Sequence, residues 1–450
     1  MSEQTITASR LHVSNEFDTL MERLDAITPL LKANADANEA GGRLTPEVEA
    51  ALLNSGAYRV GIPQNLGGYE FSPRQVIETI EKISYADASA GWVFMALQMI
   101  TGTTAAWLGE EATAELFAGD KHALIAGQGT RLGTAAKVDG GYRLSGSWSF
   151  ASGMHQATHI HTAAFCPDTN QALVFTLPKE QATLIDNWDV MGLRATGSID
   201  YVIEDVFVPD NFTYEVSIMD ALNGGALYHL GLANMSGICH TGWALGVARR
   251  LLDEMKELAG KKTGAPGATV DTDQFHAAYA KAEATLRSAR AWTMEVWADN
   301  EAALDRGELL STEQETLTRL ALNNVTWSAH EVTMAVYKWA ATAALRSGDI
   351  QRYFRDMHAG TQHVTSGPVV LQNCGRQLAG LAPNARWVFL DLQDQLDHTP
   401  PHRLRVPAAA AAGTRATTRS NHVHHVTRFP CRAPRRGSYR RSFRTDADRR

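Results

Sequence analysis

The chain has 450 residues, of which 44% are hydrophobic and 20% charged, a composition typical of a globular protein with a large core and not of a disordered chain. The formal net charge of −7 hides a division, because residues 401–450 hold 13 Arg and 2 Asp and residues 1–400 therefore carry −18. An acidic body of this kind argues against nucleic acid as a partner.

The first 17 residues are polar and lack an apolar segment, so we expect no secretory signal. Residues 90–109 are uncharged and approach membrane-spanning length, but they contain Gln98, three Thr and three Gly. We therefore predict a buried helix there and no membrane partner. The four cysteines form no CxxC pair, which favours reduced thiols in the cytoplasm. They are Cys166, Cys239, Cys374 and Cys431.

In chain order, residues 1–123 are predicted to form an N-terminal helical domain. Apolar residues recur at helical spacing over residues 16–41 and again over 73–99. Between them, Thr45 and Pro46 have the character of a helix start, and Gly56 that of a helix end.

From residue 124 to 232 the apolar period changes to two, which predicts a middle domain of short antiparallel strands. Long helical patterns return over residues 233–398, and four of them in series indicate a helical bundle. Residues 399–450 are rich in Arg and have hardly any apolar periodicity. We predict a disordered tail, either a basic arm or an out-of-frame C-terminus.

The segment "SGSWSFASG" at residues 145–153 is the most informative stretch of the predicted sheet. In a regular strand, Trp148, Phe150 and Ser152 share one face. They form either a half-buried strand that ends in a turn, or a wall for a flat heteroaromatic ligand that Ser152 binds at its edge. The preceding "GQGTRLG" has the wrong spacing for a dinucleotide fingerprint and is predicted as a loop with exposed backbone.

Histidines supply the other candidate polar groups. Three of them alternate on one strand face and are interpreted as a polar sheet surface, with no metal site predicted. These are His155, His159 and His161. In "RYFRDMHAGTQHV", His363 is either a buried structural histidine or a neutral imidazole that acts as acid, base or hydrogen-bond partner in a cleft. The same string contains a predicted ion-pair cluster of Arg352, Arg355 and Asp356.

Several strings taken together resemble the acyl-CoA dehydrogenase fold, and within it the flavin-dependent aromatic hydroxylases of two-component (group D) monooxygenases. The strings are "VGIPQNLGGYE", "ADASAGWV", "GGYRLSGSWSFASG", "WDVMGLRATGSIDYVIEDVFVPDNF" and "DIQRYFRDMHAGTQH". The likeness spans roughly residues 15–395. It implies a mostly α fold with an N-terminal helical domain, a flavin-binding β domain and a C-terminal four-helix bundle, assembled as a homotetramer.

The resemblance also assigns roles to single residues. Phe150 and Ser152 match the strand that meets the flavin ring, with the hydroxyl near N5. Gln128 and Gly129 fall in the loop at the pyrimidine edge of the flavin. His363 matches an active-site histidine, and Trp92 matches an aromatic residue of the substrate site.

Two departures from the relatives narrow the expected chemistry. Where acyl-CoA dehydrogenases carry a catalytic Glu, this chain has His363-Val364-Thr365 and therefore no carboxylate. Where several phenol hydroxylases have a second histidine, it has Ile100. The substrate site is thus expected to be apolar and suited to a neutral ring such as indole. Because the resemblance gives the flavin contact to Phe150, Trp148 is expected to belong to the hydrophobic core.

The function implied is hydroxylation of a small aromatic compound such as indole or a phenol. Reduced FMN would come from a separate NAD(P)H-dependent flavin reductase and react with O2 to a C4a-hydroperoxide, with FAD as the alternative cofactor. The alternative function is an FAD-dependent acyl-CoA dehydrogenase or oxidase. A third interpretation is a protein with the flavin-binding fold but another role. In that case the tail either gives it a binding function or leaves it non-functional.

Overall fold

The computed structural model describes residues 16–119, 121–216, 218 and 220–394, and the structural statements below concern this part of the chain. Its first part is helical, as predicted. The helices are α1 (Glu16–Gly41), α2 (Pro46–Ser55), α3 (Pro73–Ala86), α4 (Ala88–Trp107) and α5 (Glu110–Phe117). Helix α4 is buried along nearly its whole length, which confirms the buried helix predicted for residues 90–109. Within the described ranges, no helix is both long and apolar enough to cross a lipid bilayer.

Side-chain caps determine where these helices begin. The Thr45 hydroxyl accepts the backbone N–H of Val48, Pro46 occupies the first turn, and Gly56 ends α2 with φ of 83°. These features confirm the helix start and end predicted from the sequence.

The start of α4 has a buried cap. The Asp87 carboxylate accepts the backbone N–H groups of Ser89 at 2.8 Å and Ala90 at 3.3 Å. Its other oxygen accepts the side-chain amide of Asn38 from α1 at 2.9 Å. The cap therefore fixes the first turn of α4, which carries Trp92, against α1.

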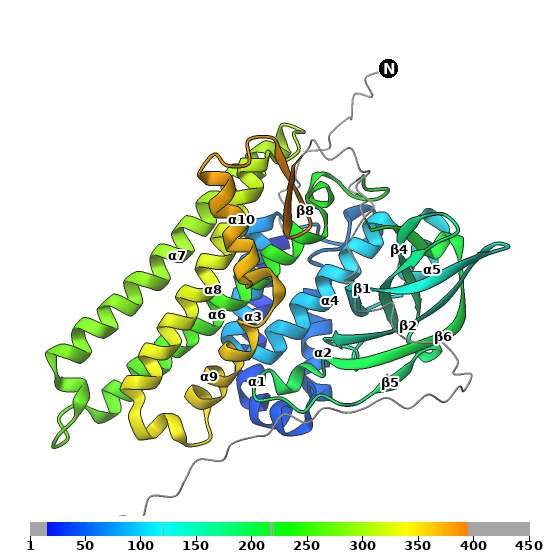
Figure 1. The fold of residues 1–450 in the computed structure, drawn as a ribbon. Coiled ribbons are helices and arrows are strands. Elements are labelled where there is room, and N and C mark those ends of the chain that lie inside the picture. The colour runs from blue at the N-terminus through cyan, green and yellow to red at the C-terminus, as the bar shows by residue number, and fades with distance from the viewer. Residues whose placement is uncertain (1–15, 120, 217, 219, 395–450) are drawn as a thin grey trace, which may run out of the picture. The chain divides into compact units, whose positions relative to one another are not determined.

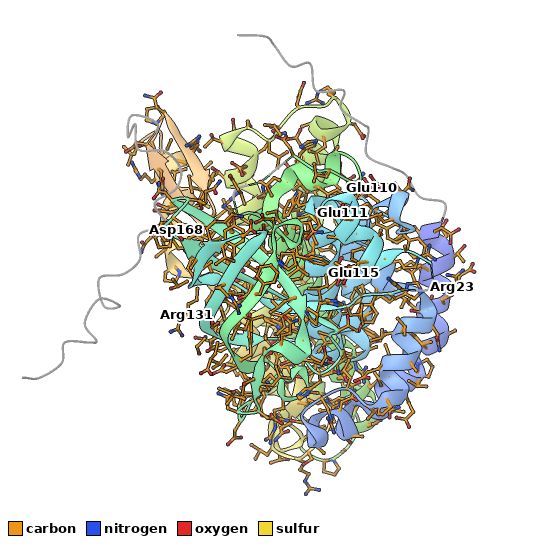
Figure 2. All side chains as sticks on the ribbon, turned by 90° about the vertical axis from the view of Figure 1, so that its right-hand side faces the viewer. Arg23, Glu110, Glu111, Glu115, Arg131 and Asp168 are labelled. Carbon is orange, nitrogen blue, oxygen red and sulfur yellow. The ribbon has the colours of Figure 1, made fainter. Side chains whose placement is uncertain are left out.

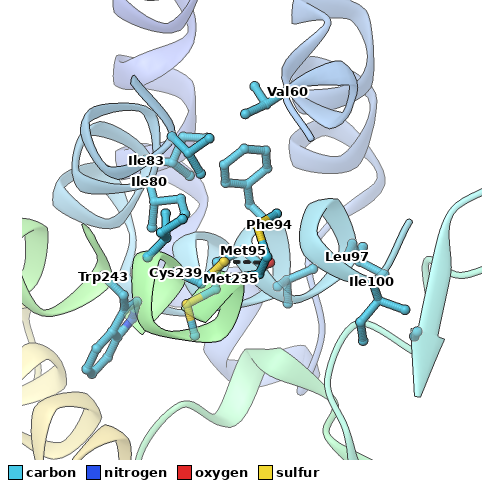
Figure 3. Close-up of a cluster of buried hydrophobic side chains, with 14 of the residues drawn as sticks. Val60, Ile80, Ile83, Phe94, Met95, Leu97, Ile100, Met235, Cys239 and Trp243 are labelled. Atoms are coloured by element: carbon cyan, nitrogen blue, oxygen red, sulfur yellow. Dashed lines mark hydrogen bonds between the residues drawn. The ribbon is translucent and has the colours of Figure 1, made fainter. Parts of the chain in front are cut away.

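The core around α4 is formed with α3 and α6 (Gly231–Lys262), and Figure 3 shows its side chains in close packing. Cys239 of α6 donates its thiol to the carbonyl of Met95 in α4 at 3.6 Å. Other buried members of this cluster are Val60, Ile80, Ile83, Phe94, Leu97, Ile100, Met235 and Trp243. Helix α4 also contacts strand β1 (Ile125–Val138), so it lies between the sheet and the long helices (Figure 1).

The middle of the chain forms a seven-stranded sheet in the order β5-β6-β2-β1-β3-β4-β7. After β1, its strands are β2 (Gly141–Ala151), β3 (His159–Cys166), β4 (Gln171–Pro178), β5 (Thr183–Ile185), β6 (Ile199–Pro209) and β7 (Thr213–Glu215). All neighbours are antiparallel except β1 and β3, which run parallel. The predicted β domain is confirmed, apart from this one parallel pair.

The "GQGTRLG" segment is part of strand β1, so its prediction as a loop is wrong. Its register against β3 shifts between Gln128 and Gly133, which forms a bulge. Local sequence favoured a loop because of the glycines, whereas pairing of Gly127, Gln128 and Gly133 with β3 keeps the segment in the sheet. At the surface of the same strand Arg131 is exposed (Figure 2).

Acidic side chains gather on α5, near the sheet. Glu110, Glu111 and Glu115 are exposed there, and Figure 2 shows them on one side of the molecule. Glu111 also accepts the side-chain amide of Asn211, which precedes β7, at 3.2 Å. These side chains are part of the negative charge that residues 1–400 carry.

The last part of the described chain is the helical bundle. Helices α6, α7 and α8 are the long members and run side by side in Figure 1. The helices after α6 are α7 (Asp273–Asp305), α8 (Thr312–Ala340), α9 (Asp349–Gly360) and α10 (Pro368–Leu378). A short hairpin of β8 (Ala385–Val388) and β9 (Asp391–Asp394), which the sequence patterns did not predict, follows α10. The mostly α fold is confirmed, the domain boundaries stay predictions, and the tail predicted at 399–450 lies outside the described residues.

Helix α9 is joined directly to the segment before β6. A side chain at Gly192 would place its Cβ 2.1 Å from the carbonyl oxygen of Arg355, so only glycine allows this approach. The next residue, Leu193, donates its backbone N–H to Oδ1 of Asp356 at 2.6 Å. Burial raises the pKa of Asp356 to about 7, and its Oδ2 has no hydrogen-bond partner in the described part of the chain.

The ion pairs of α9 differ from the predicted cluster. Arg352 pairs with Asp349 and with Asp36 of α1, while Arg355 pairs with Glu39. Asp356 instead accepts a backbone N–H, so the predicted Arg352, Arg355 and Asp356 cluster is wrong. Arg352 and Arg355 thus pair with α1, Arg355 also donates to the carbonyl of Met191 at 2.8 Å, and Asp356 contacts the same segment before β6.

We expect Asp356→Asn to stabilise the protein increasingly as the pH rises. Between the unfolded pKa near 4 and the folded pKa of about 7, the folded state binds the extra proton, so this group lowers the free energy of unfolding as the pH increases. Asparagine keeps an oxygen acceptor for Leu193 and removes the ionisation. Relative to wild type, its free energy of unfolding should rise by up to roughly 4 kcal/mol between about pH 4 and pH 8.

Urea denaturation across this pH range measures the effect. The matched control is Asp205→Asn, because the Asp205 side chain is 78% exposed. Parallel pH profiles for the Asp356 variant and wild type would show that this carboxyl does not titrate as inferred.

Candidate active site

The end of strand β2 does not alternate regularly. Trp148 is fully buried and stacks on Tyr201 with ring centroids 5.4 Å apart, whereas Phe150 is 66% exposed. The register between β2 and β6 shifts between Trp148 and Ala151, and Phe150 has φ of 67°. The predicted common face of Trp148, Phe150 and Ser152 is therefore wrong, and the assignment of Trp148 to the core is confirmed.

The exposed Phe150 ring contacts the half-buried ring of Trp188. Their rings meet edge to face, with centroids 6.0 Å apart at 89°. Trp188 is held by its indole N–H, which donates to the carbonyl of Leu193 at 3.0 Å. Both Phe150 and Leu193 have a positive φ, which costs free energy in residues other than glycine. An exposed aromatic ring on strained backbone is typical of a surface that binds a ligand.

A chain of hydroxyl groups begins at Ser152. The indole N–H of Trp92 donates to Ser152 Oγ at 3.0 Å. Ser152 Oγ lies 2.6 Å from Ser198 Oγ, which lies 2.7 Å from Thr196 Oγ1. Gly153, with φ of 78°, donates its backbone N–H to the carbonyl of Thr196. The turn after β2 is thus held against the start of β6, and α4 is attached to it through one indole.

Two histidines pack against the other side of Trp92. His240 of α6 and His363 stack with ring centroids 3.7 Å apart and planes at 24°. Trp92 makes a T-shaped contact with each imidazole, and its ring centroid lies 5.1 Å from that of His240 and 6.0 Å from that of His363. The structure therefore brings together Trp92, Ser152 and His363, three predicted site residues that lie far apart in the sequence.

His240 was missed by the sequence analysis. It lies in "ICHTGW", within a long helical pattern and with no motif around it, so only the packing of α6 against α4 reveals it. An isolated histidine in a helix is most often structural, and no local signal distinguishes this one.

Both imidazoles are neutral at pH 7. Burial lowers the pKa of His240 to about 4, and burial together with His240 lowers the pKa of His363 well below its ordinary value. The backbone N–H of Thr365 donates to His363 Nδ1 at 3.4 Å, and the Thr365 hydroxyl lies 2.8 Å from the same atom. Nδ1 is thus an acceptor, and the ring proton of His363 is on Nε2.

Gln128 and Gly129 lie at the β1 bulge. Gln128 Oε1 accepts the backbone N–H of Arg131 at 3.0 Å, and its carbonyl accepts the Thr162 hydroxyl at 3.3 Å. A Cβ at Gly129 would lie 3.6 Å from Nε2 of His161. His161 is 3% exposed, so the prediction that it lies on a polar sheet surface is wrong. Its Nδ1 lies 3.3 Å from the hydroxyl of Thr104 in α4 and 3.2 Å from the hydroxyl of Tyr214 in β7, and these elements enclose it.

Ile100 lies in the core of α4, eight residues after Trp92, or about 12 Å along the helix. It is 7% exposed and belongs to the buried cluster of Figure 3. Contact of Ile100 with substrate stays a prediction.

A flavin fits the groups at this site. Phe150 offers an exposed aromatic face, and Ser152, two residues later, offers a hydroxyl for the edge of a ring. In addition, Nε2 of His240 is buried without a hydrogen-bond partner among the described residues, which indicates that a bound molecule completes this site.

Comparison with known proteins identifies the family. Residues 238–367 match the family described as acyl-CoA dehydrogenase, C-terminal domain. Indole-3-acetate monooxygenase of Pseudomonas putida is 31% identical, over 76% of this chain and 88% of that protein. The flavin-dependent monooxygenase oxygenase subunit HsaA of Rhodococcus jostii is 28% identical, over 77% of this chain and 94% of that protein. The crystal structure of the 3-HSA hydroxylase from Rhodococcus sp. RHA1 matches with a TM-score of 0.76 and 27% identity. The match covers 80% of this chain and 96% of that chain.

The chain belongs to the flavin-dependent monooxygenases of the acyl-CoA dehydrogenase fold. The resemblance stated from sequence, the fold class and the monooxygenase activity are confirmed, and so is a flavin as the cofactor. The alternative of an acyl-CoA dehydrogenase or oxidase is not supported by these relatives. The roles of the individual site residues in this monooxygenase stay predictions.

Phe150→Ala should separate binding from stability in this monooxygenase. Because the Phe150 ring is 66% exposed, its removal should change the free energy of unfolding by less than about 1 kcal/mol. Loss of an aromatic stacking partner should weaken binding of reduced FMN by roughly three- to tenfold. An anaerobic titration of the protein with reduced FMN measures the affinity.

Trp148→Ala is the matched control on the same strand, because Trp148 is fully buried and its removal should cost roughly 3–5 kcal/mol of stability. Unchanged affinity for reduced FMN in the Phe150 variant would remove this ring from the flavin site.

Proposed function

We propose that this monooxygenase is the oxygenase component of a two-component system and hydroxylates a small aromatic compound such as indole. It uses O2 and a reduced flavin, and a separate NAD(P)H-dependent reductase supplies this flavin. The flavin is FMN, with FAD as the alternative. The observation that carries the proposal is the cluster of Trp92, Ser152, His240 and His363. Its described contacts join aromatic rings, a hydroxyl and two neutral imidazoles, and none of them involves a carboxylate.

The names of the relatives support this proposal. One is a monooxygenase of an indole derivative, and another is described as an oxygenase subunit, which implies a further component of the system. The bound flavin supplies the activation of O2 and the transfer of one oxygen atom to an electron-rich ring carbon.

Ser152 would hold the edge of the flavin, at N5, through its hydroxyl. Because the Trp92 indole N–H already donates to Ser152 Oγ, the hydroxyl proton of Ser152 is available to Ser198 or to a bound ring. His363 carries its proton on Nε2, and this N–H would be the donor available to the oxygen atom that the reduced flavin and O2 supply. Trp92 closes the site against water, and Ile100 keeps the adjoining core apolar.

We also retain a homotetramer and the domain limits 1–123, 124–232 and 233–398 as proposals. The three cysteines in the described part of the chain are free and buried, which supports a reducing compartment such as the cytoplasm.

Reconstitution tests the proposed function. The purified chain, a flavin reductase, NADH and FMN are supplied with indole, where a blue pigment reports oxidation, and separately with 4-hydroxyphenylacetate. We expect hydroxylated product only when the reductase is present. His363→Ala should retain the wild-type far-UV circular dichroism and lose product formation. Purification with tightly bound FAD, together with oxidation of an acyl-CoA in the absence of the reductase, would favour the dehydrogenase alternative.

Ser152→Ala should uncouple flavin oxidation from hydroxylation. A neutral hydrogen bond is worth about 1 kcal/mol, so the ratio of hydroxylated product to H2O2 should fall about fivefold, while the affinity for FMN changes less. The control is Ser198→Ala, which removes the next hydroxyl of the chain and leaves Ser152 in place. Equal coupling in the Ser152 variant and wild type would show that this hydroxyl does not protect the oxygen transfer.

A further inference from the structure

The hydrogen bonds of His240 leave one of its ring nitrogens without a partner. Nδ1 lies 2.8 Å from the carbonyl oxygen of Ser236, one turn earlier in α6, and therefore carries the ring proton that it donates. Nε2 is then a lone-pair acceptor. The side chain is 8% exposed, and Nε2 has no hydrogen-bond partner in the described part of the chain.

The surroundings of His240 do not require a histidine. Its ring lies between the stacked His363 and the edge of Trp92, which also packs at 90° on Trp243. A phenyl ring would make similar contacts without burying an unsatisfied acceptor, which costs free energy. The lone pair therefore indicates a hydrogen-bond donor that arrives with a ligand.

The two stacked imidazoles have complementary hydrogen-bonding groups. His363 has its N–H on Nε2, and His240 has its lone pair on Nε2. One ring can therefore donate to an oxygen atom while the other accepts from a substrate. The pKa of His240 near 4 keeps this acceptor neutral throughout the neutral pH range.

We propose that His240 is a specificity-determining residue whose Nε2 accepts a hydrogen bond from the N–H or O–H group of the aromatic substrate. The inference rests on the proposed function and narrows its substrate class to aromatic rings that carry a hydrogen-bond donor. Indole and phenols belong to this class, and benzofuran, an isostere of indole without the N–H, does not. A buried acceptor rejects such an isostere because its own hydrogen bond is left unmade.

Binding without turnover tests the proposal. Dissociation constants for indole and benzofuran are measured by calorimetry under anaerobic conditions with reduced FMN present, for wild type, His240→Phe and His240→Gln. Wild type should bind indole roughly three- to tenfold more tightly than benzofuran. His240→Phe, which keeps the stacking, should lose this preference, and His240→Gln, which restores an oxygen acceptor, should retain most of it.

A second pair of ligands, 4-hydroxyphenylacetate and phenylacetate, distinguishes an O–H donor from an N–H donor. Far-UV circular dichroism and the urea midpoint check that both variants fold. The proposal is overturned if wild type binds neither donor ligand, if it shows no preference within either pair, or if His240→Phe keeps the wild-type preference. The reductase-dependent product assay tests the proposed function separately. Hydroxylation of ligands with and without a donor group, together with no binding preference, would contradict only the role of His240.

Discussion

The hydrogen bond from the Trp92 indole to Ser152 is the contact on which the rest of the site depends. It joins a buried helix to the turn that ends a strand, two elements whose positions are set independently. The Asp87 cap and the core around Phe94 fix α4, while pairing with β6 fixes β2. One hydrogen bond of ordinary length can join them only because each already lies in place. The hydroxyl is thereby oriented before any ligand binds, which lowers the entropy that binding must remove.

The same site is kept neutral by burial. Burial lowers the pKa of both imidazoles, and the stacked His240, 3.7 Å away, lowers the pKa of His363 further. A neutral site suits uncharged aromatic rings, and neutrality leaves each histidine with a defined donor and a defined acceptor. The neutrality of the site and its pairing of a donor with an acceptor both depend on the two histidines together.

The contact of α9 with the sheet positions the loop that carries His363. Gly192 allows the backbone to approach Arg355, and Leu193 donates to Asp356 in the same turn of the helix. Three residues after α9 ends, the His363 side chain accepts the backbone N–H of Thr365. Gly192 and the buried Asp356 therefore hold the segment before β6 against α9, the helix that leads into the His363 loop.

The sequence by itself determined the order of helical, β and helical parts, the caps of α2 and the burial of residues 90–109, because periodicity and capping are local properties. The assignment of Trp148 to the core came from the family resemblance. The sequence also singled out Trp92, Ser152 and His363 through the same resemblance. Only the tertiary structure decided that these three meet, that "GQGTRLG" is a bulged strand, that Phe150 turns outward and that His240 joins the site. The physical reason is that hydrophobic periodicity tells which face of an element is buried, whereas the partner of that face depends on the register shifts and close contacts of chain segments far apart in sequence.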